Sequence, residues 1–236
     1  EVIMNPAHQL SKEDFSRWSR QTVLSEIGLE GQKKLMKANI VIVGMGGLGC
    51  PAAQSLMAAG VGHLKIVDGD KVELSNLHRQ PLYGAEDVGR MKVEVAKEKL
   101  ERLNRDAVVE VADLYLNEDN GFNIINETDI VIDATDNIPT RILIDRFSKE
   151  LGIPMVYGGL FRYEGQIGVF NINGSKGYTD LFPISRSDKD NCANSGVLGM
   201  LPGIIGNIQA LETIKLIVGI KPNLAGKLLM YDGMNH

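Results

Sequence analysis

The chain has 236 residues, a formal net charge of −5 and an apolar content of 44%. This length suits one substantial α/β domain with an ordinary globular core. No block of like charges exceeds a few residues, so neither nucleic acid nor an anionic membrane is an expected partner. No apolar run approaches the roughly 18 residues of a membrane span. The first residues lack the apolar core of a signal peptide, so we expect a cytoplasmic protein.

Strand-like segments alternate with helix-length segments along most of the chain. Short apolar runs predict strands, and the longer segments between them have helical spacing. This βαβ order predicts an α/β fold, a Rossmann-like and mostly parallel twisted sheet with helices on both faces, and antiparallel strands toward the C-terminus. The expected strands are 39–44, 63–68, 107–112, 129–135, 154–159, 163–172 and 226–232, and the expected helices are 49–62, 89–104, 140–152 and 202–219.

Two of these helices have apolar residues repeated at helical spacing. In each, one face is expected to pack on the sheet. The last helix is expected to stop at Gly219. The expected core positions are Met91, Val95 and Leu100 in the first, and Ile204, Ile208, Leu211 and Ile214 in the last.

The segment "IVIVGMGGLGC" at 40–50 joins a run of apolar β-formers to four glycines. GxGxxG spacing after a strand and before a helix is typical of a loop that binds a diphosphate at the helix N-terminus. Gly44 allows the tight turn, and Gly49 lets the helix pack closely on the sheet. Gly46 and Gly47 let backbone N–H groups approach a phosphate. The glycines leave open whether that diphosphate belongs to NAD or to ATP.

Asp68 ends the second expected strand, nineteen residues after the last glycine of the loop. An acid at that position can accept hydrogen bonds from both ribose hydroxyls, which fits NAD and ATP equally. Asp70 is expected to cap a turn. The ribose acid therefore does not choose between the two nucleotides either.

The segments that follow favour ATP. "ELSNLHRQ" at 73–80 places Asn76 and Arg79 beside the ribose acid, where an amide can hold one phosphate oxygen and a guanidinium can contact phosphate bidentately. Lys92 stands in the first turn of an expected helix. A cation there opposes the helix dipole at a cost of roughly a few tenths of a kcal/mol, which an anionic ligand would offset. A solvated lysine is the alternative at this position, and an NAD site needs none of these residues.

The segment "DATDN" at 133–137 follows a fully apolar strand. Two carboxylates near polyphosphate suit magnesium, which prefers one or two carboxylates together with water and phosphate oxygens. Asp136 lies further toward the cleft and is the expected magnesium ligand. Asn137, beside it, is counted with Asp136 among the nucleotide-binding residues. Asp133 could be a buried cap instead.

Together these motifs resemble the ubiquitin-activating-enzyme-like family. "GMGGLGC", "VDGDKVELSNLHRQ", "VGRMKVE" and "DATDN" occur in the family's order, and the resemblance runs from about Phe15 to Asp232. Within that family the chain resembles the sulfur-carrier adenylyltransferases of molybdopterin and thiamine biosynthesis. The resemblance implies an enzyme that uses ATP and Mg²⁺ to adenylate the C-terminal glycine carboxylate of a small β-grasp ubiquitin-like carrier protein ending in Gly-Gly, with release of pyrophosphate.

The resemblance also assigns roles to individual residues. Asp68 would hold the ribose, Asp136 would organise magnesium, and Asn76, Arg79 and Lys92 would hold the phosphates. "SRWSRQ" at 16–21 matches the family's N-terminal arginine element, which implies a homodimer in which Arg20 reaches the ATP site of the neighbouring subunit. A helix-surface arginine is the alternative for Arg20.

Cys192 and Cys50 are the two cysteines of the chain. Cys192 matches a family loop whose cysteine, in some relatives, forms a thioester or an acyl-disulfide with the carrier; a plain loop thiol is the alternative. Cys50 is expected in the core. Many relatives hold zinc with two CxxC pairs, but here the place of the first pair reads "GYTD" at 177–180. Two cysteines cannot supply four thiolates, so zinc is not expected.

The resemblance implies a single adenylation domain over 1–236, with an N-terminal helical arm at about 11–36, a nucleotide-binding half at about 37–137 and a carrier-binding half at about 138–236. Three other functions remain open. The chain could be an NAD-dependent oxidoreductase or a non-catalytic partner subunit that binds a ubiquitin-like protein. It could also activate a carboxylate on a modified tRNA.

Overall fold

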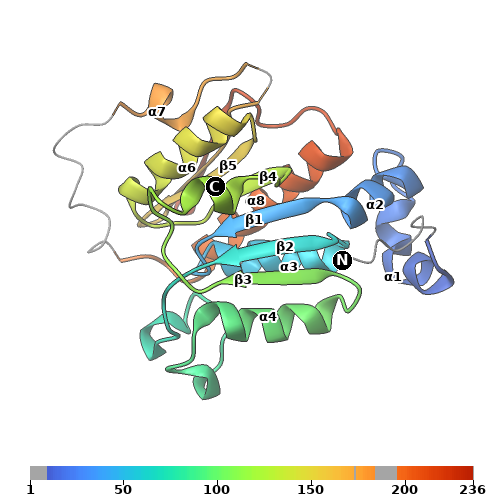
Figure 1. The fold of residues 1–236 in the computed structure, drawn as a ribbon, viewed down its shortest axis with the longest axis horizontal. Helices are drawn as coiled ribbons and strands as arrows, with labels where there is room; N and C mark the ends of the chain where they lie inside the picture. The colour runs from blue at the N-terminus through green and yellow to red at the C-terminus, as the bar shows by residue number, and fades with distance from the viewer. Residues whose placement is uncertain (1–9, 173, 184–195, 236) are drawn as a thin grey trace.

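A single seven-stranded sheet forms the centre of the molecule, in the strand order β3-β2-β1-β4-β5-β6-β7 (Figure 1). The structure is a computed structural model that describes residues 10–172, 174–183 and 196–235. Strands β1 to β5 pair in parallel, and β6 and β7 are antiparallel, as the sequence predicts. The strands are β1 (Asn39–Val43), β2 (His63–Val67), β3 (Val108–Ala112), β4 (Ile130–Asp133), β5 (Met155–Phe161), β6 (Glu164–Phe170) and β7 (Leu228–Asp232).

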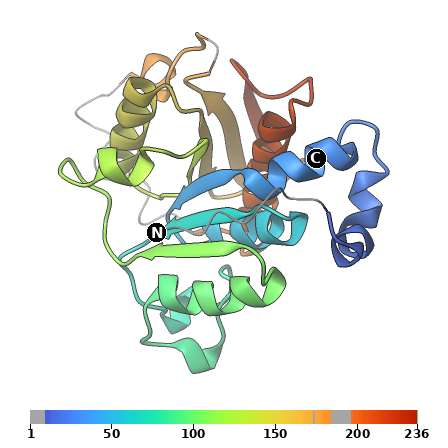
Figure 2. The same cartoon turned by 45° about the vertical axis from the view of Figure 1, so that its right-hand side comes forward.

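Helices cover both faces of this sheet, which confirms the predicted architecture (Figures 1 and 2). Because side chains alternate along a strand, Ile40 and Ile42 of β1 join the core on one face, while Val41 and Val43 join the core on the other. The helices are α1 (Lys12–Thr22), α2 (Gly28–Lys37), α3 (Gly49–Ala59), α4 (Lys92–Leu103), α5 (Gly121–Ile125), α6 (Ile138–Leu151), α7 (Tyr178–Leu181) and α8 (Met200–Val218).

The predicted core face of α8 is wrong for Ile204 and Leu211, while Ile208 and Ile214 pack against the core. Leu211 is 54% exposed and Ile204 is 37% exposed, whereas Ile208 and Ile214 are only partly buried. The buried face carries Leu201 and Ile205 together with polar residues such as Gln209, whose amide donates to the carbonyl oxygens of β4 and β5. The helix therefore satisfies strand ends with polar side chains, so its apolar spacing does not mark the face that packs on the sheet.

Helix α8 is also long and apolar enough, by length and composition, to cross a membrane. No apolar run of that length is expected from the sequence, because charged and polar residues interrupt the apolar ones in this helix. Half of its most apolar window is buried within the fold, which is how the core helix of a compact domain reads.

The N-terminal helices lie beside the start of β1, away from the carboxyl ends of the parallel strands (Figure 1). Trp18 anchors α1, because its indole N–H donates to the carbonyl oxygen of Ala58 at 3.0 Å and its side chain is buried. Arg20, two residues further on, is exposed on the same helix. Arg20 is thus carried at the opposite end of the sheet from the ends of β1, β2 and β4.

The turn between β1 and α3 depends on two glycines. Gly44 adopts φ +97°, a left-handed conformation that favours glycine. A Cβ at Gly49 would overlap the carbonyl oxygen of Gly44. Both positions therefore let α3 begin directly behind the end of β1, as the motif predicts.

Replacing Gly49 with alanine should lower the free energy of unfolding by about 3 kcal/mol, because the new methyl group meets backbone that must shift. Gly203→Ala is the matched control, since a Cβ at that position in α8 meets nothing within 4 Å. The control should raise the free energy of unfolding by roughly 0.5–1 kcal/mol. Urea unfolding measures both, and equal stability of the two variants would contradict the packing argument.

Candidate nucleotide-binding and adenylation site

A cavity of about 1260 Å³ lies at the carboxyl ends of β1, β2 and β4 and extends to the hairpin between β5 and β6. Its position is the one where open parallel sheets bind ligands. Gly49 lies outside its lining, behind the turn. The predicted residues that line the cavity are Gly44, Gly46, Gly47, Asp68, Asn76, Arg79, Lys92, Asp136 and Asn137.

Asp68 fixes the glycine turn to the loop after β2. One carboxylate oxygen accepts from the backbone N–H of Met45 at 2.7 Å, and the other accepts from that of Asp70 at 2.8 Å. Burial raises the pKa of Asp68, although nearby Lys92 and these hydrogen bonds work in the opposite direction. Each oxygen keeps capacity for another donor, so ribose hydroxyls remain compatible with this carboxylate.

Lys92 is buried, which excludes the solvated lysine that the sequence left open. Its side chain is 7% exposed, and Nζ lies 2.7 Å from Asp70 Oδ2 and 3.9 Å from Asp68 Oδ2. The residue begins α4, so the paired carboxylates also offset the unfavourable helix dipole. Lys92 is therefore a charged donor held at the cavity wall beside the glycine turn.

Asp70 and Tyr115 belong to this group, and sequence reasoning missed them. The Tyr115 hydroxyl donates to Asp70 Oδ1 at 2.6 Å, and both residues line the cavity. Partial burial favours a higher pKa for Asp70, but hydrogen bonds from Lys92 and Tyr115 hold that pKa below its usual value. The hydrogen bond between Tyr115 and Asp70 raises the pKa of Tyr115 to about 12. Asp70 thus does more than cap a turn.

A short 3₁₀ turn, Leu74–Asn76, places the next two candidates at the cavity. The buried amide of Asn76 accepts from the backbone N–H of Glu73 at 3.2 Å. Arg79 donates from Nη1 to the Ser75 carbonyl oxygen at 2.9 Å. Within the described parts of the chain no carboxylate forms an ion pair with Arg79. Nη1 also lies 2.9 Å from His78 Nε2, so an anion in the cavity would bind through the other edge of the guanidinium, at Nη2 and Nε.

The floor of the cavity contains a buried ion pair between Asp133 and Arg141. Arg141 Nε lies 2.7 Å from Asp133 Oδ2. The other oxygen of the same carboxylate accepts from the backbone N–H and the hydroxyl of Thr135. The guanidinium also stacks on the ring of Tyr157, with 4.7 Å between them. Burial alone would lower the pKa of Arg141, but Asp133 raises it above its usual value. Asp133 is thus the structural cap that the sequence allowed, and Arg141 was not foreseen.

Asp136 and Asn137 stand at the mouth of the same cavity, and both are exposed. Asn137 caps α6 by accepting from the Thr140 backbone N–H at 2.9 Å, so its side-chain oxygen already has a partner. The described residues contain no cluster of three or more metal-binding side chains. A metal at Asp136 would therefore depend on phosphate and water for its other ligands, which is the pattern that magnesium accepts.

One predicted catalytic residue is not brought to the cavity of this chain, and another cannot be placed from the described residues. Arg20 does not line it, in keeping with the distant position of α1. Cys192 lies outside the residues that the structure describes. Cys50 is fully buried, as predicted, and its burial raises the pKa of the thiol to about 12.

The ThiF family model matches residues 18–236. The adenylyltransferase and sulfurtransferase MOCS3 of Aedes aegypti is 44% identical over 97% of this chain and 53% of its own length. The sulfur carrier protein adenylyltransferase of Thermus thermophilus is 43% identical over 95% of this chain and 85% of its own length. The chain thus spans about half the length of the MOCS3 relative and most of the bacterial one.

Solved structures share the fold. The PaaA crystal structure superposes with a TM-score of 0.83 at 26% identity, covering 99% of this chain and 76% of PaaA. The structure of Escherichia coli MccB with ATP gives a TM-score of 0.77 at 21% identity, covering 92% of this chain and 70% of MccB. These likenesses agree with the βαβ order read from the sequence.

Cys50 should not react with thiol reagents in the folded protein. With its pKa near 12, only about one Cys50 thiol in 10⁵ is ionised at pH 7. A Cys192→Ala variant should therefore show no fast thiol in a titration with a chromogenic disulfide, and one thiol per chain after unfolding. A rapidly reacting thiol in the folded variant would contradict the burial of Cys50.

Proposed function

We propose that this chain, which belongs to the ThiF family, is an ATP-dependent adenylyltransferase acting on the C-terminal glycine carboxylate of a small ubiquitin-like sulfur-carrier protein. One observation carries the proposal: a single cavity joins the glycine turn, the carboxylate of Asp68 and the cations Arg79 and Lys92. The names of the mosquito and Thermus relatives support it from a second direction.

The reaction places two anions in contact, and the cavity is equipped for that difficulty. A carboxylate oxygen of the carrier attacks the α-phosphorus of ATP, and the bond to the pyrophosphate oxygen breaks as the acyl-phosphate bond forms. Arg79, Lys92 and the backbone N–H groups of the glycine turn would neutralise the developing charge more strongly in the transition state than in the ground state. The attacking carboxylate is already ionised, so the step needs no general base.

Magnesium, when bound with ATP, would supply additional positive charge to the phosphates. Asp136 is the proposed ligand because its exposed carboxylate lines the cavity beside the phosphate-binding candidates. Asp68 is proposed to hold the ribose, and Asn76 to hold a phosphate oxygen. Cys192 is proposed to act only after adenylation, by attacking the acyl-adenylate with release of AMP, because a thiol neutralises no phosphate charge.

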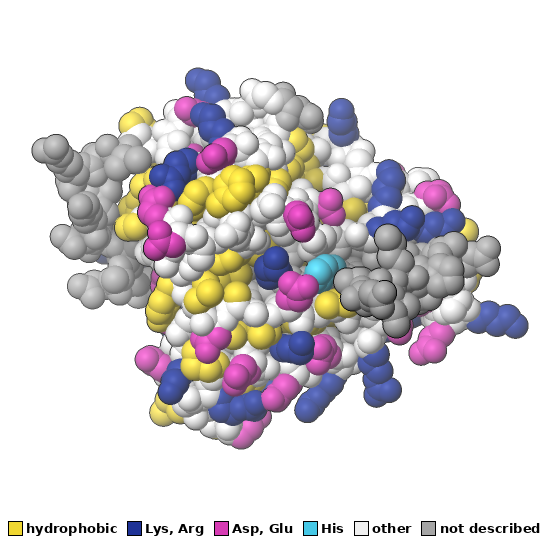
Figure 3. Space-filling view, viewed as in Figure 1, with side chains coloured by type: hydrophobic (Ala, Val, Ile, Leu, Met, Phe, Trp, Pro, Cys, Tyr) yellow, Lys and Arg dark blue, Asp and Glu magenta, His cyan; other side chains and the backbone are white. Residues whose placement is uncertain are grey.

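The carrier is proposed to enter through residues 138–236, where the cavity continues between the β5–β6 hairpin and the aromatic side chains of Tyr157 and Tyr178. An oxidoreductase would leave Arg79, Lys92 and Asp136 without a role, and a non-catalytic subunit would have no need to bury a paired lysine there. On the face in Figure 3 acidic and basic side chains are interspersed, which does not favour a nucleic-acid partner.

A homodimer is proposed because Arg20 cannot serve the cavity of its own chain. Helix α1 lies at the opposite end of the sheet from the strand ends that form the cavity (Figure 1). An arginine from a neighbouring copy would add a further cation to a site that handles polyphosphate. The proposal also includes a single adenylation domain over residues 1–236 and a cytoplasmic location.

The protein should catalyse carrier-dependent ATP–pyrophosphate exchange with magnesium, tested against small ubiquitin-like proteins that end in Gly-Gly. Lys92→Ala and Arg79→Ala should each lower exchange by about 10²-fold or more, because each removes a donor to the phosphates. Arg105→Ala, an exposed arginine outside the cavity lining, is the control. Cys192→Ala should keep exchange near that of the unmodified protein. Calorimetric binding of NAD without binding of ATP would rule out the proposal.

Arg20→Ala should lower ATP–pyrophosphate exchange by about 10²-fold. A partner subunit that keeps Arg20 should restore part of this activity. Mixed with Asp136→Ala protein under conditions of subunit exchange, Arg20→Ala protein should regain about a quarter of the normal activity, since half of the dimers are mixed and each has one complete site. Arg17→Ala is the control on the same helix. No recovery after exchange has been verified by mass spectrometry would show that Arg20 does not act between subunits.

A further inference from the structure

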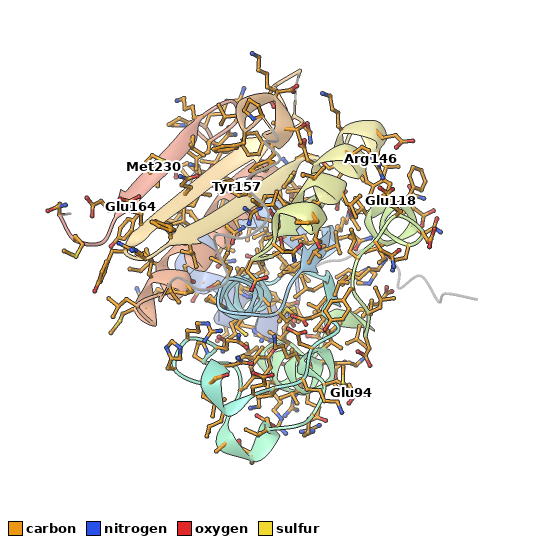
Figure 4. The ribbon with its side chains drawn as sticks, turned by 90° about the vertical axis from the view of Figure 1, so that its left-hand side faces the viewer. Glu94, Glu118, Arg146, Tyr157, Glu164 and Met230 are labelled. Atoms are coloured by element: carbon orange, nitrogen blue, oxygen red, sulfur yellow. The ribbon has the colours of Figure 1, made fainter. Side chains whose placement is uncertain are left out.

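The segment 177–182 contributes Tyr178 and Phe182 to the aromatic wall of the cavity. Tyr178 is buried and packs against Tyr157 of β5 and against Phe182, with ring centroids 5.1 Å and 4.8 Å apart. All three aromatic residues line the cavity. Figure 4 shows Tyr157 on the sheet surface, with helix α6 passing beside that strand. What holds this segment therefore shapes the cavity opposite the phosphate site.

One buried carboxylate ties the segment to helix α6. Asp145 is 1% exposed and accepts from the backbone N–H groups of Tyr178 at 2.8 Å and Thr179 at 3.0 Å. It also accepts from the Thr179 hydroxyl at 2.8 Å and from the Asn171 amide at 2.9 Å. Four donors match the capacity of one carboxylate. Among the described residues no lysine or arginine pairs with it, so hydrogen bonds alone hold its charge.

Asn171 extends this anchor into the end of β6. Its side-chain amide donates to the Asp145 carbonyl oxygen at 3.1 Å and to the Ser148 hydroxyl at 2.8 Å, in addition to the carboxylate. Asn171 adopts φ +58°, which asparagine tolerates better than most residues. Helix α6, the end of β6 and the segment 177–182 therefore meet at one polar cluster behind the aromatic wall.

The residues at this place do not fit zinc, which the resemblance associates with thiolates at positions 177 and 180. Gly177 offers no ligand atom, and a Cβ there would lie 2.7 Å from Asp145 Oδ1 and 2.9 Å from Asn171 Oδ1. Asp180 already accepts from the Gly177 backbone N–H at 2.8 Å and lies 3.3 Å from Lys149. A tetrahedral zinc site needs four ligands, and the anchor occupies the space that a side chain at 177 would need.

We propose that Asp145 is a positioning residue that replaces a metal ion as the anchor of this wall. The carboxylate collects the donors of the segment 177–182 and holds Tyr178 and Phe182 against Tyr157. That the wall receives the carrier rests on the proposed function. The wall is thus assembled by hydrogen bonds to one helix, and Gly177 is required because the carboxylate comes so close to the backbone.

Asp145→Asn tests the anchor, because the amide keeps the shape but turns one acceptor atom into a donor that faces other donors. The variant should lower the melting temperature and weaken the near-ultraviolet circular dichroism of the tyrosine cluster. With the carrier that supports exchange, KM for the carrier should rise by about tenfold or more, while KM for ATP stays unchanged. Asp119→Asn, an exposed acid outside the cavity lining, should change none of these.

The second part of the test measures zinc content and melting temperature in the unmodified protein and in the double variant Gly177→Cys/Asp180→Cys. Purified protein should contain no stoichiometric zinc, and excess 1,10-phenanthroline should leave its melting temperature unchanged. The double variant should be less stable and should not gain zinc. One zinc per chain in the unmodified protein, or melting that falls with chelator, would overturn the proposal.

Two further outcomes would also overturn it. An unchanged melting temperature in Asp145→Asn would show that the carboxylate is not the anchor. A lowered melting temperature with an unchanged KM for the carrier would show that the anchor does not position the carrier wall. If no carrier supports exchange, the proposed function fails, and the melting, circular dichroism and zinc measurements still decide whether Asp145 replaces the metal.

Discussion

The end of the cavity at the glycine turn depends on a buried lysine, Lys92, that is held by carboxylates before any anion arrives. Burying an unpaired charge at the position of Lys92 would cost a large desolvation free energy. The structure avoids that cost by holding Lys92 against Asp70 and near Asp68, while Tyr115 binds the other oxygen of Asp70. The ion pair therefore links the loops after β2 and β3 to the start of α4. The proposed polyphosphate ligand would therefore meet a cation whose position is already set, and little further ordering of Lys92 would be needed on binding.

The second ion pair of the cavity, between Asp133 and Arg141, is arranged for a different purpose. Asp133 is completely buried. Arg141 donates hydrogen bonds to Asp133, to the carbonyl oxygen of Thr135 and to that of Gly158. Asp70, by contrast, has a side chain that is 49% exposed. A ligand can thus compete for Lys92 at the cavity surface, whereas the pair of Asp133 and Arg141 ties the end of β4 to the middle of β5. Two similar ion pairs, one after β2 and one at the end of β4, differ in role because they differ in exposure.

The sequence predicts most of what is local. The strand after residue 38 and the glycine turn that follows it are specified by adjacent residues, and both are confirmed. Tyr115 could not be foreseen, because it reaches Asp70 only when β3 takes its place beside β2 at the edge of the sheet. Arg141 left a weak signal, since an arginine one turn into the helix after a buried acid is well placed to pair with it. Helix α8 misled the prediction because Gln209 and Glu212 are buried for their hydrogen bonds, which apolar spacing does not register.

The two ends of the cavity impose opposite chemical demands, and Arg141 lies where they meet. Toward the glycine turn the lining is ionic, with Lys92 and Arg79, as binding of phosphate requires. Toward the β5–β6 hairpin it becomes aromatic, with Tyr157 and Tyr178 stacked near the Arg141 guanidinium at 4.7 Å and 5.5 Å. A guanidinium can serve both environments, because its edge donates hydrogen bonds while its face packs on aromatic rings. The chain thus passes from a charged surface to an aromatic one within a single cavity, and the buried charge of Arg141 between them is paired with Asp133. That continuity is what the proposed reaction, which would join a phosphate to the end of a polypeptide, requires of one site.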